Sequence, residues 1–301
     1  MKTEAVNFGG LDAIKICNDR LEMVVVSSLG PRIAFLGFEG ESNLLYWKND
    51  DLGRQGWRLL GGHRVWVTRP GADESEDAYA ADNEPCRVSL EEDRLTVTGA
   101  EHPFLRTERG LKIQVLDETS FEVTSFVTNT GPMLYSGGVW APTCLLPQPG
   151  QEFGILLGDR RLSWDLVRIV IPRKFAGHTA PVADPQVRFS EDFMIVLPGG
   201  IETKRMLMAP MGIAAMTWPE KNCSFIKRSR FNPRGKYPLD CNLAIYNAPG
   251  NFMLEMESFG EEQTLIPGSI MELKERWTLV EQSLDWSDPG QVIDLSGGWD
   301  W

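Results

Sequence analysis

Residues 111–127 read LKIQVLDETSFEVTSFV, and this stretch decides the fold class. Apolar and polar residues alternate through 111–115 and again through 121–127, and a period of two places every second side chain on the same face of a β-strand. Asp117-Glu118 lies between the two runs and predicts the turn of a hairpin. We therefore expect two antiparallel strands here.

The same alternation recurs along most of the chain. No segment of twelve or more residues has a regular 3.6-residue apolar period, so alternating βα units are disfavoured and an antiparallel sandwich or barrel is favoured. The further strands are expected at 21–26, 32–36, 154–157, 193–197, 212–217, 223–227, 252–259 and 270–279.

No internal repeat or low-complexity linker divides the 301 residues. Large β-sandwiches exceed 250 residues as one domain, and we predict a single all-β domain over residues 1–283. The stretch 71–84 is acidic and rich in small residues, which predicts a long loop. The alternating strand pattern ends before the C-terminal tail, residues 284–301. Either the tail is mobile, or its tryptophans dock it on the domain.

Composition excludes several classes of partner. A formal net charge of −12 repels phosphate backbones and anionic lipid, so nucleic acid and membranes are not expected partners. The five cysteines are scattered without CxxC spacing, which is typical of free thiols in a reducing compartment. With no secretory pattern at the start and three histidines in all, we expect a cytoplasmic protein with no metal and no cofactor.

The first candidate motif is GGHRVW at 61–66. Its two glycines allow a tight turn or a close approach to a ligand, and they place His63 and Arg64 at the mouth of a strand. A guanidinium can bind hydroxyls or carboxylates, and an imidazole can move protons near neutral pH. A glycine turn with a surface histidine and arginine explains the motif equally well.

The second candidate motif is YAADNEP at 79–85. Asp82 and Asn83 are residue types that bind sugar hydroxyls, but they stabilise loops through local backbone bonds just as often. For this motif alone, the loop interpretation is the better one.

The third candidate motif is NFMLEME at 251–257. Alternation places Glu255 and Glu257 on one face of a strand, about 7 Å apart. Such a pair can supply a catalytic base whose pKa is raised by the second acid. A solvent-facing strand is the alternative, but Met253 and Phe259 share the face, which indicates that it is partly covered and favours function.

Glu275 interrupts an apolar row of Leu273, Trp277 and Leu279 on the strand at 270–279. A carboxylate in such a row must be paired or hydrogen-bonded, and a structural ion pair with a lysine or arginine is favoured over catalysis. Ten tryptophans are many for a core of this size, and we expect two or three of them to offer aromatic faces to a sugar ring.

Taken in order, these motifs resemble the galactose-mutarotase-like superfamily, and most of all its aldose-epimerase-related branch. The resemblance covers residues 14–280. The matching pieces are GPRI at 30–33, GGHRVW at 61–66, YAADNEP at 79–85, NTG at 129–131 before a strand with Trp140, a strand ending at Lys227, YP at 237–238 followed by Asn242 and Tyr246, ExE at 255–257, LIPG at 265–268 and ERWTL at 275–279.

The resemblance implies a β-supersandwich with a sugar site on the concave face of one sheet. Enzymes of this superfamily interconvert sugar anomers: a glutamate removes the proton of the anomeric hydroxyl and a histidine protonates the ring oxygen. It implies that Glu255 is the base, but Trp140 occupies the position that best matches the acid histidine. We therefore predict His63 as the acid, with His178 as second choice. Relatives often carry an acidic residue where this chain has Thr68-Arg69-Pro70, and a glutamate where it has Ala244, which indicates a different substrate preference.

We predict a carbohydrate-binding protein of the mutarotase type that takes a free sugar or oligosaccharide and exists as a monomer or homodimer. The alternatives are a non-catalytic sugar-binding protein, or a lyase or hydrolase for uronate-containing oligosaccharides. The mutarotase needs His63 and Glu255 to face each other across one pocket, and the lyase needs three of Arg64, Arg69, Lys204 and Lys227 to converge there. The predicted substrate-binding residues are Arg64, Arg69, Tyr79, Asp82, Asn83, Trp140, Lys204, Lys227, Tyr246 and Glu257.

Overall fold

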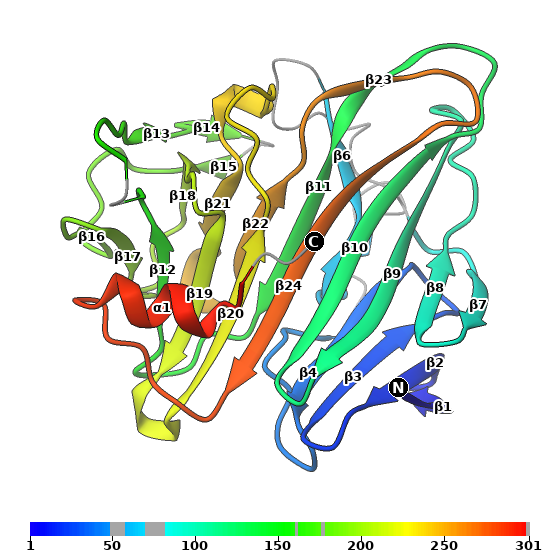
Figure 1. The fold of residues 1–301 in the computed structure, drawn as a ribbon, viewed down its shortest axis with the longest axis horizontal. Coiled ribbons are helices and arrows are strands. Elements are labelled where there is room, and N and C mark those ends of the chain that lie inside the picture. Colours follow the sequence, from blue (N-terminus) through cyan, green and yellow to red (C-terminus); the bar gives the residue numbers. More distant parts are fainter. Residues whose placement is uncertain (49–57, 70–81, 160–161, 176–177, 299–301) are drawn as a thin grey trace.

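Two large antiparallel sheets packed face to face make up the protein (Figure 1). The computed structural model describes residues 1–48, 58–69, 82–159, 162–175 and 178–298. Every strand pairing among these residues is antiparallel, as the alternating sequence predicts. The chain is therefore all-β, with one short α-helix in its described part.

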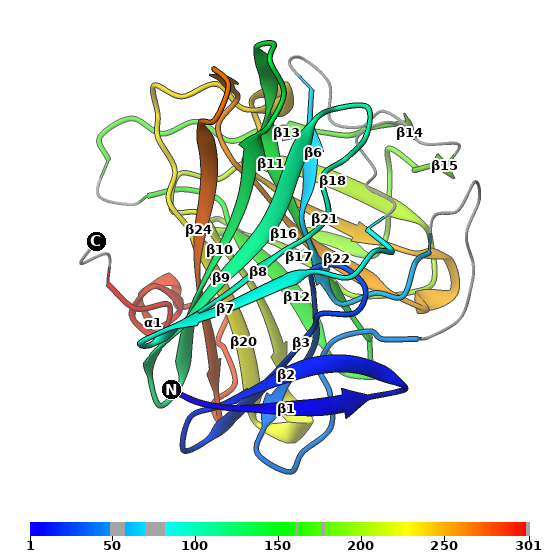
Figure 2. The ribbon, with the colours of Figure 1, turned by 90° about the vertical axis from the view of Figure 1, so that its right-hand side faces the viewer.

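The first sheet has twelve strands in the described chain, and the N-terminal hairpin forms one of its edges (Figure 2). Its order is β1 (Lys2–Phe8), β2 (Leu11–Cys17), β3 (Leu21–Val26), β4 (Arg32–Phe38), β5 (His63–Arg64), β11 (Tyr135–Leu145), β22 (Leu254–Phe259), β21 (Leu243–Asn247), β18 (Thr203–Met208) and β13 (Arg168–Val170), with β6 (Trp66–Thr68) and β23 (Gln263–Leu265) also paired to β11.

The second sheet has ten strands in the same residues, and short 3₁₀ turns join several strands of the two sheets. Its order is β16 (Val187–Phe189), β17 (Phe193–Val196), β12 (Glu152–Leu156), β19 (Ile213–Trp218), β20 (Cys223–Ser229), β24 (Ile270–Val280), β10 (Ser120–Asn129), β9 (Thr107–Asp117), β8 (Arg94–Thr98) and β7 (Arg87–Glu91); β14 (Lys174–Phe175) and β15 (His178–Thr179) form a separate pair. The predicted hairpin at 111–127 is the β9–β10 pair.

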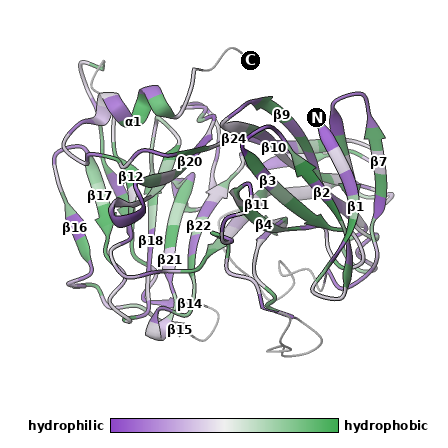
Figure 3. Cartoon of the chain, turned by 90° about the horizontal axis from the view of Figure 1, so that it is seen from below, coloured by the Kyte–Doolittle hydropathy of each residue, from purple (hydrophilic) through white to green (hydrophobic). Residues whose placement is uncertain are grey.

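The hydrophobic core lies between the two sheets, and hydrophobic residues, green in Figure 3, occur along the strands of both. On β22 the core-facing residues are Leu254 and Met256, each fully buried. Removal of such side chains from water stabilises a fold by about 25 cal/mol per Å² of apolar surface. Because side chains alternate along a strand, the same packing sends Glu255 and Glu257 to the opposite face of the sheet.

The C-terminal tail docks on the outer face of the second sheet. The Trp286 ring lies 5.2 Å from that of Phe193, and its indole N–H donates to Glu152 Oε2 at 2.7 Å. Beyond it, α1 (Pro289–Leu295) buries Val292 against the sheet (Figure 1). Of the two alternatives for residues 284–298, the structure shows docking. No described helix is long and apolar enough to cross a membrane.

Candidate functional site

The candidate site lies on the side of the twelve-stranded sheet that faces away from the ten-stranded sheet, and we call this side the site face. Glu255 and Glu257 of β22 point to it, and register places Cys144 and Pro142 of β11 beside them on one flank. Tyr246 and Ala244 of β21 flank them on the other side. Neighbouring strands are about 4.8 Å apart, so these side chains form one continuous strip.

Glu257 is held in place by two donors. The Trp140 indole N–H donates to Glu257 Oε2 at 2.8 Å, and Lys204 Nζ lies 3.3 Å from the same oxygen. Lys204 is the register partner of Tyr246 and reaches Glu257 past the small Ala244. Its Nζ also lies 5.2 Å from the centre of the Trp140 ring. All of these side chains except Tyr246 are at most 1 % exposed, so Glu257 serves as a fixed, charge-paired group.

Glu255 lies where the site face reaches the surface. It is 8 % exposed and Tyr246 is 9 % exposed, against 0 % for Glu257. The Cys144 thiol lies 3.3 Å from Glu255 Oε1 and donates to it. Burial, together with the nearby Glu255 charge, raises the pKa of Cys144 well above its usual value, so the thiol keeps its proton.

Tyr246 brings a second proton-bearing group beside Glu255. Its hydroxyl donates to Glu202 Oε1 at 2.8 Å. Burial raises the pKa of Tyr246, and the hydrogen bond to Glu202 and the charge of Glu255 raise it further. The phenol is therefore a hydrogen-bond donor at every pH the protein meets.

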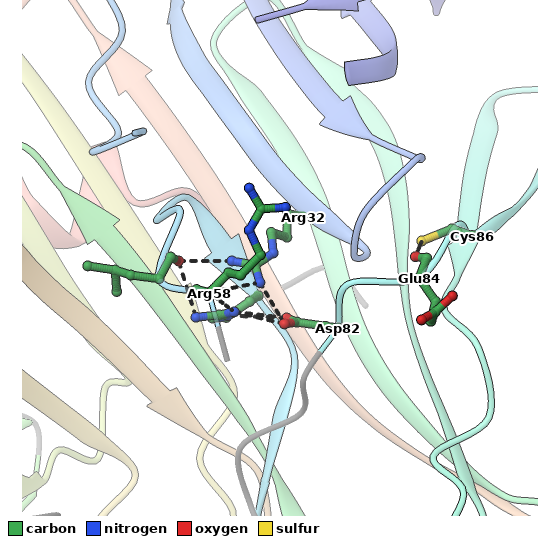
Figure 4. A network of polar contacts seen from close by, with 7 residues as sticks. Arg32, Arg58, Asp82, Glu84 and Cys86 are labelled. Carbon is green, nitrogen blue, oxygen red and sulfur yellow. Dashed lines mark hydrogen bonds and ion pairs between the residues drawn. The ribbon is translucent and has the colours of Figure 1, made fainter. Parts of the chain in front are cut away.

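A pair of arginines also lies on the site face, across β11 from β22. Arg32 and Arg64 are register partners on β4 and β5, both fully buried. They share Asp82, whose Oδ1 lies 2.6 Å from Arg32 Nη2 and 2.8 Å from Arg64 Nη2 (Figure 4). The backbone carbonyls of residues 58 and 59 accept further bonds from both guanidiniums. Burial, and then the neighbouring Arg64, lower the pKa of Arg32.

Aromatic rings line the same face. The Arg64 guanidinium lies 4.4 Å from the centre of the Trp66 ring, and Trp66 packs edge-on against Trp140 at 4.9 Å. Phe259 stacks on the other side of Trp140 at 6.2 Å. Two tryptophans therefore belong to the site face, and both are at most 3 % exposed.

Seven of the predicted site residues come together on the site face. Cys144 lies between the Arg32–Arg64 pair and Glu255. The charge of Glu255 raises the pKa of its thiol, and the charges of Arg64 and Arg32 lower it. The two predicted carboxylates, the arginine with its aspartate and the predicted lysine thus form one site. The seven are Arg64, Asp82, Trp140, Lys204, Tyr246, Glu255 and Glu257.

His63 is not among them, and its predicted pairing with Glu255 is not found. The ring points between the sheets, where Nδ1 lies 2.8 Å from Thr143 Oγ1 and Nε2 lies 3.2 Å from Ser125 Oγ. Complete burial, and next the charge of Lys227, lower the pKa of His63 well below its usual value. The sheet itself separates His63 from Glu255, so His63 is not a proton donor to a sugar on the site face.

Lys227 also lies between the sheets and not in a sugar site. Its Nζ is 3.1 Å from Glu275 Oε1, 2.8 Å from Thr143 Oγ1 and 3.1 Å from the Met256 carbonyl oxygen. The predicted structural ion pair of Glu275 is confirmed. An ammonium group can only donate, so the Thr143 hydroxyl oxygen accepts from Lys227. The Thr143 O–H therefore donates to His63 Nδ1, and His63 is the neutral tautomer with its hydrogen on Nε2.

The other predicted residues lie elsewhere. Arg69 is exposed beyond the end of β6, where its charge acts on Tyr135, so Arg64 and Lys204 are the two of the four cations that share the site face. The predicted convergence of three cations is therefore wrong. Asn83 is half-buried next to Asp82, and Tyr79 lies outside the described residues. His178 belongs to the small β14–β15 pair.

Arg32 and Cys144 are site-face residues that the sequence analysis did not assign. Arg32 had a signal, because it begins an otherwise apolar strand, and a buried charge beside such a row needs a partner. Cys144 had none, since a cysteine in an apolar strand is ordinary core material. Within the described ranges, no three His, Cys, Asp or Glu side chains are grouped so that they could hold a metal ion.

Neither a protein-family model nor a curated protein sequence matches the chain. Solved structures do resemble it. A galactose mutarotase-like protein from Lactobacillus casei has a TM-score of 0.61 at 13 % identity over 89 % of this chain and all of that one. A candidate aldose 1-epimerase from Escherichia coli K12 has a TM-score of 0.61 at 11 % identity, over 88 % and 98 %.

A third similar structure is a galactose mutarotase related enzyme from Lactobacillus acidophilus. Its TM-score is 0.59 at 12 % identity, over 90 % of this chain and 98 % of that one. All three likenesses extend over nearly the whole of each chain, so they concern the complete architecture and not one hairpin. The chain has the galactose-mutarotase-like fold.

Proposed function

We propose that the chain binds a pyranose sugar on the site face and acts on it as a mutarotase-type isomerase, with Glu255 as the base. The observation that carries the proposal is the contrast between the two glutamates. Glu257 is locked by Lys204 and Trp140, whereas Glu255 is 8 % exposed and lies beside two hydrogen-bond donors, Cys144 and Tyr246. The similar structures are named as aldose 1-epimerase or galactose mutarotase-like proteins, which supports the same reaction class.

In this mechanism Glu255 accepts the proton of the anomeric hydroxyl, the electron pair left on that oxygen forms the carbonyl, and the bond from the anomeric carbon to the ring oxygen breaks. The ring oxygen then takes a proton from Tyr246. Both reacting oxygens are bonded to the same carbon, so an acid and a base on adjacent strands can reach them together. Reclosure on the other face of the carbonyl returns both protons and gives the other anomer.

The test is anomer exchange measured by NMR saturation transfer with a panel of free aldoses and uronic acids. We expect wild type to accelerate exchange of at least one neutral sugar. Glu255→Gln keeps the shape and hydrogen bonds of the site but cannot accept the proton, so it should abolish acceleration and leave sugar affinity largely intact. Glu118→Gln, in the exposed β9–β10 turn, is the matched control. Acceleration that persists in Glu255→Gln removes Glu255 from the mechanism.

A non-catalytic sugar-binding protein is the second candidate. It is favoured by the chemistry of the donors near Glu255, because Cys144 and Tyr246 both have raised pKa values and are weak acids at neutral pH. Neither His63 nor His102 is on the site face. Sugar-induced chemical shifts without any accelerated exchange would select this candidate.

The uronate lyase is not retained, because its cation cluster does not form. We also propose, as the simplest setting for this activity, a small-molecule sugar partner, a cytoplasmic location, and a monomer or homodimer. The five cysteines are free, in keeping with a reducing compartment.

A further inference from the structure

A second cavity lies away from the site face, on the ten-stranded sheet. It has a volume of about 580 Å³ and lies between the loop that follows β20, the segment after β22 and the start of β24 (Figure 1). Pockets of about 300–1,000 Å³ are the size that small ligands occupy. Gly260, which lines the groove, directly follows Phe259, whose buried ring stacks on Trp140 of the site face.

One wall of the groove is aromatic. Phe231 is half-buried and stacks on Tyr237, with the ring centres 5.1 Å apart and the planes at 27°. The Tyr237 hydroxyl accepts the Asn232 backbone N–H at 2.9 Å. Burial raises the pKa of Tyr237 to about 12, so the hydroxyl keeps a hydrogen that it can donate. A ring fixed in this way is a platform for the C–H face of a pyranose.

The loop that carries this wall is fixed against the opposite side of the groove. The Asn232 amide donates to Glu261 Oε2 at 3.2 Å. Gly235 lies against the same glutamate so closely that an added Cβ would come within 2.6 Å of its carboxyl carbon. The groove is therefore built by specific contacts between its two sides.

The charged groups of the groove differ in whether they have hydrogen-bond or ion-pair partners. The Glu261 carboxylate accepts from Asn232, and Glu272 pairs with Lys112 at 2.5 Å. Arg230 lines the groove and is exposed, and its guanidinium makes no hydrogen bond or ion pair with any described side chain. Arg230 is therefore the cation left for a ligand. Its planar guanidinium can donate two parallel hydrogen bonds to a carboxylate.

We propose that this groove binds an acidic saccharide, with Arg230 on the carboxylate of a uronate unit, Phe231 against its ring, and Asn232 and Gln263 at its hydroxyls. The site goes beyond the proposed function, because it lies on another face and needs neither Glu255 nor catalysis. Its ligand class differs too, since the cations of the site face already have carboxylate partners.

The test is titration of the protein with trigalacturonate, followed by amide chemical shifts, with neutral galactotriose as the comparison. We expect trigalacturonate to shift the amides of Asn232 and Gln263 and galactotriose to bind at least tenfold more weakly. Arg230→Gln should weaken trigalacturonate about tenfold, the lower end for a charge-assisted contact. Phe231→Leu should weaken both sugars about threefold.

Arg234→Gln is the matched control, because Arg234 is an exposed arginine of the same loop that does not line the groove. It should bind trigalacturonate like wild type, and so should Glu255→Gln. No binding at millimolar trigalacturonate, equal binding of the neutral sugar, or unchanged affinity in Arg230→Gln would each overturn the proposal. Loss of binding in Glu255→Gln would place the ligand on the site face and overturn it as well, whatever the anomer-exchange result.

Discussion

Two clusters on opposite sides of the twelve-stranded sheet contain the same three residue types in nearly the same arrangement, one on the site face of that sheet and one on the inner face of the ten-stranded sheet. On the site face, Glu257 has a lysine at 3.3 Å and accepts a tryptophan N–H at 2.8 Å. Between the sheets, Glu275 has Lys227 at 3.1 Å and accepts the Trp277 N–H at 3.3 Å. Each lysine also lies over a tryptophan ring, at 5.2 Å for Lys204 and 5.6 Å for Lys227.

What differs is what surrounds each group. The interior cluster is closed on both sides by sheets and gains extra bonds from Ser258, Thr143 and the Met256 carbonyl. The site-face cluster includes Glu257, two positions along β22 from Glu255, which is 8 % exposed. Residue type alone therefore does not separate a structural ion pair from a binding site. The side of the strand decides, because one step along β11 or β22 moves a side chain from the core to the site face.

The strongest way to break this comparison is to remove each lysine in turn. Lys227→Met leaves Glu275 buried without its cation and should destabilise the fold by about 3–5 kcal/mol. Lys204→Met should cost less, about 1–3 kcal/mol, because loss of Lys227 also takes the donor from Thr143 Oγ1 and from the Met256 carbonyl. Urea unfolding of both variants measures the difference. Equal losses would mean that the two clusters are energetically alike.

A rescue variant separates charge from packing in the interior cluster. In Lys227→Met with Glu275→Leu both charges are gone, and replacement of a buried pair by apolar residues is often neutral. We expect this double variant to recover most of the stability lost in Lys227→Met. If it remains as unstable as the single variant, the lysine stabilises the fold through its bonds to Thr143 and Met256 and not through Glu275.

Adjacent residues of β11 give a second, smaller contrast. Thr143 faces the interior and joins Lys227 to His63, whereas Cys144 faces Glu255. Thr143→Val keeps the volume but leaves two buried polar groups each short of a partner, at about 2 kcal/mol. Cys144→Ala removes one weak donor and a small volume, at about 1 kcal/mol. Chemical denaturation of the two variants should rank them in that order, and the reverse order would contradict the assignment of faces.

The sequence predicted most of the fold because alternation reports strands directly. It placed Glu255 and Glu257 together for the same reason, and it predicted the ion pair of Glu275 because a charge in an apolar row needs a partner. It could not place His63. The side of the sheet that a two-residue strand such as β5 presents depends on its pairing with Thr143, which lies eighty positions away in the sequence.

The same limit explains Lys227 and Arg69. Lys227 alternates regularly on β20, but nothing in its strand tells which face meets the twelve-stranded sheet and which is covered by the C-terminal tail. Arg69 follows Arg64 by five residues, yet the end of β6 carries it away from the site. Grouping of cations from different strands depends on sheet order, and sheet order is set by contacts distant in sequence.

The smallest effect that sharpens the comparison is the pH dependence that His63 gives to stability. Burial holds its folded-state pKa well below the unfolded value of about 6.5. As the pH falls below about 6.5, His63 binds a proton in the unfolded chain but not in the folded chain. The free energy of unfolding should therefore drop by about 1.4 kcal/mol per pH unit because of His63. His63→Gln, which has no such proton to bind, should show a shallower loss of stability between pH 6.5 and 5 in urea unfolding. Identical pH slopes of the unfolding free energy in wild type and variant would mean that His63 takes up its proton in the folded state. That result would contradict its place among Thr143, Ser125 and Lys227. It would return His63 to the side of the sheet where Glu255 lies.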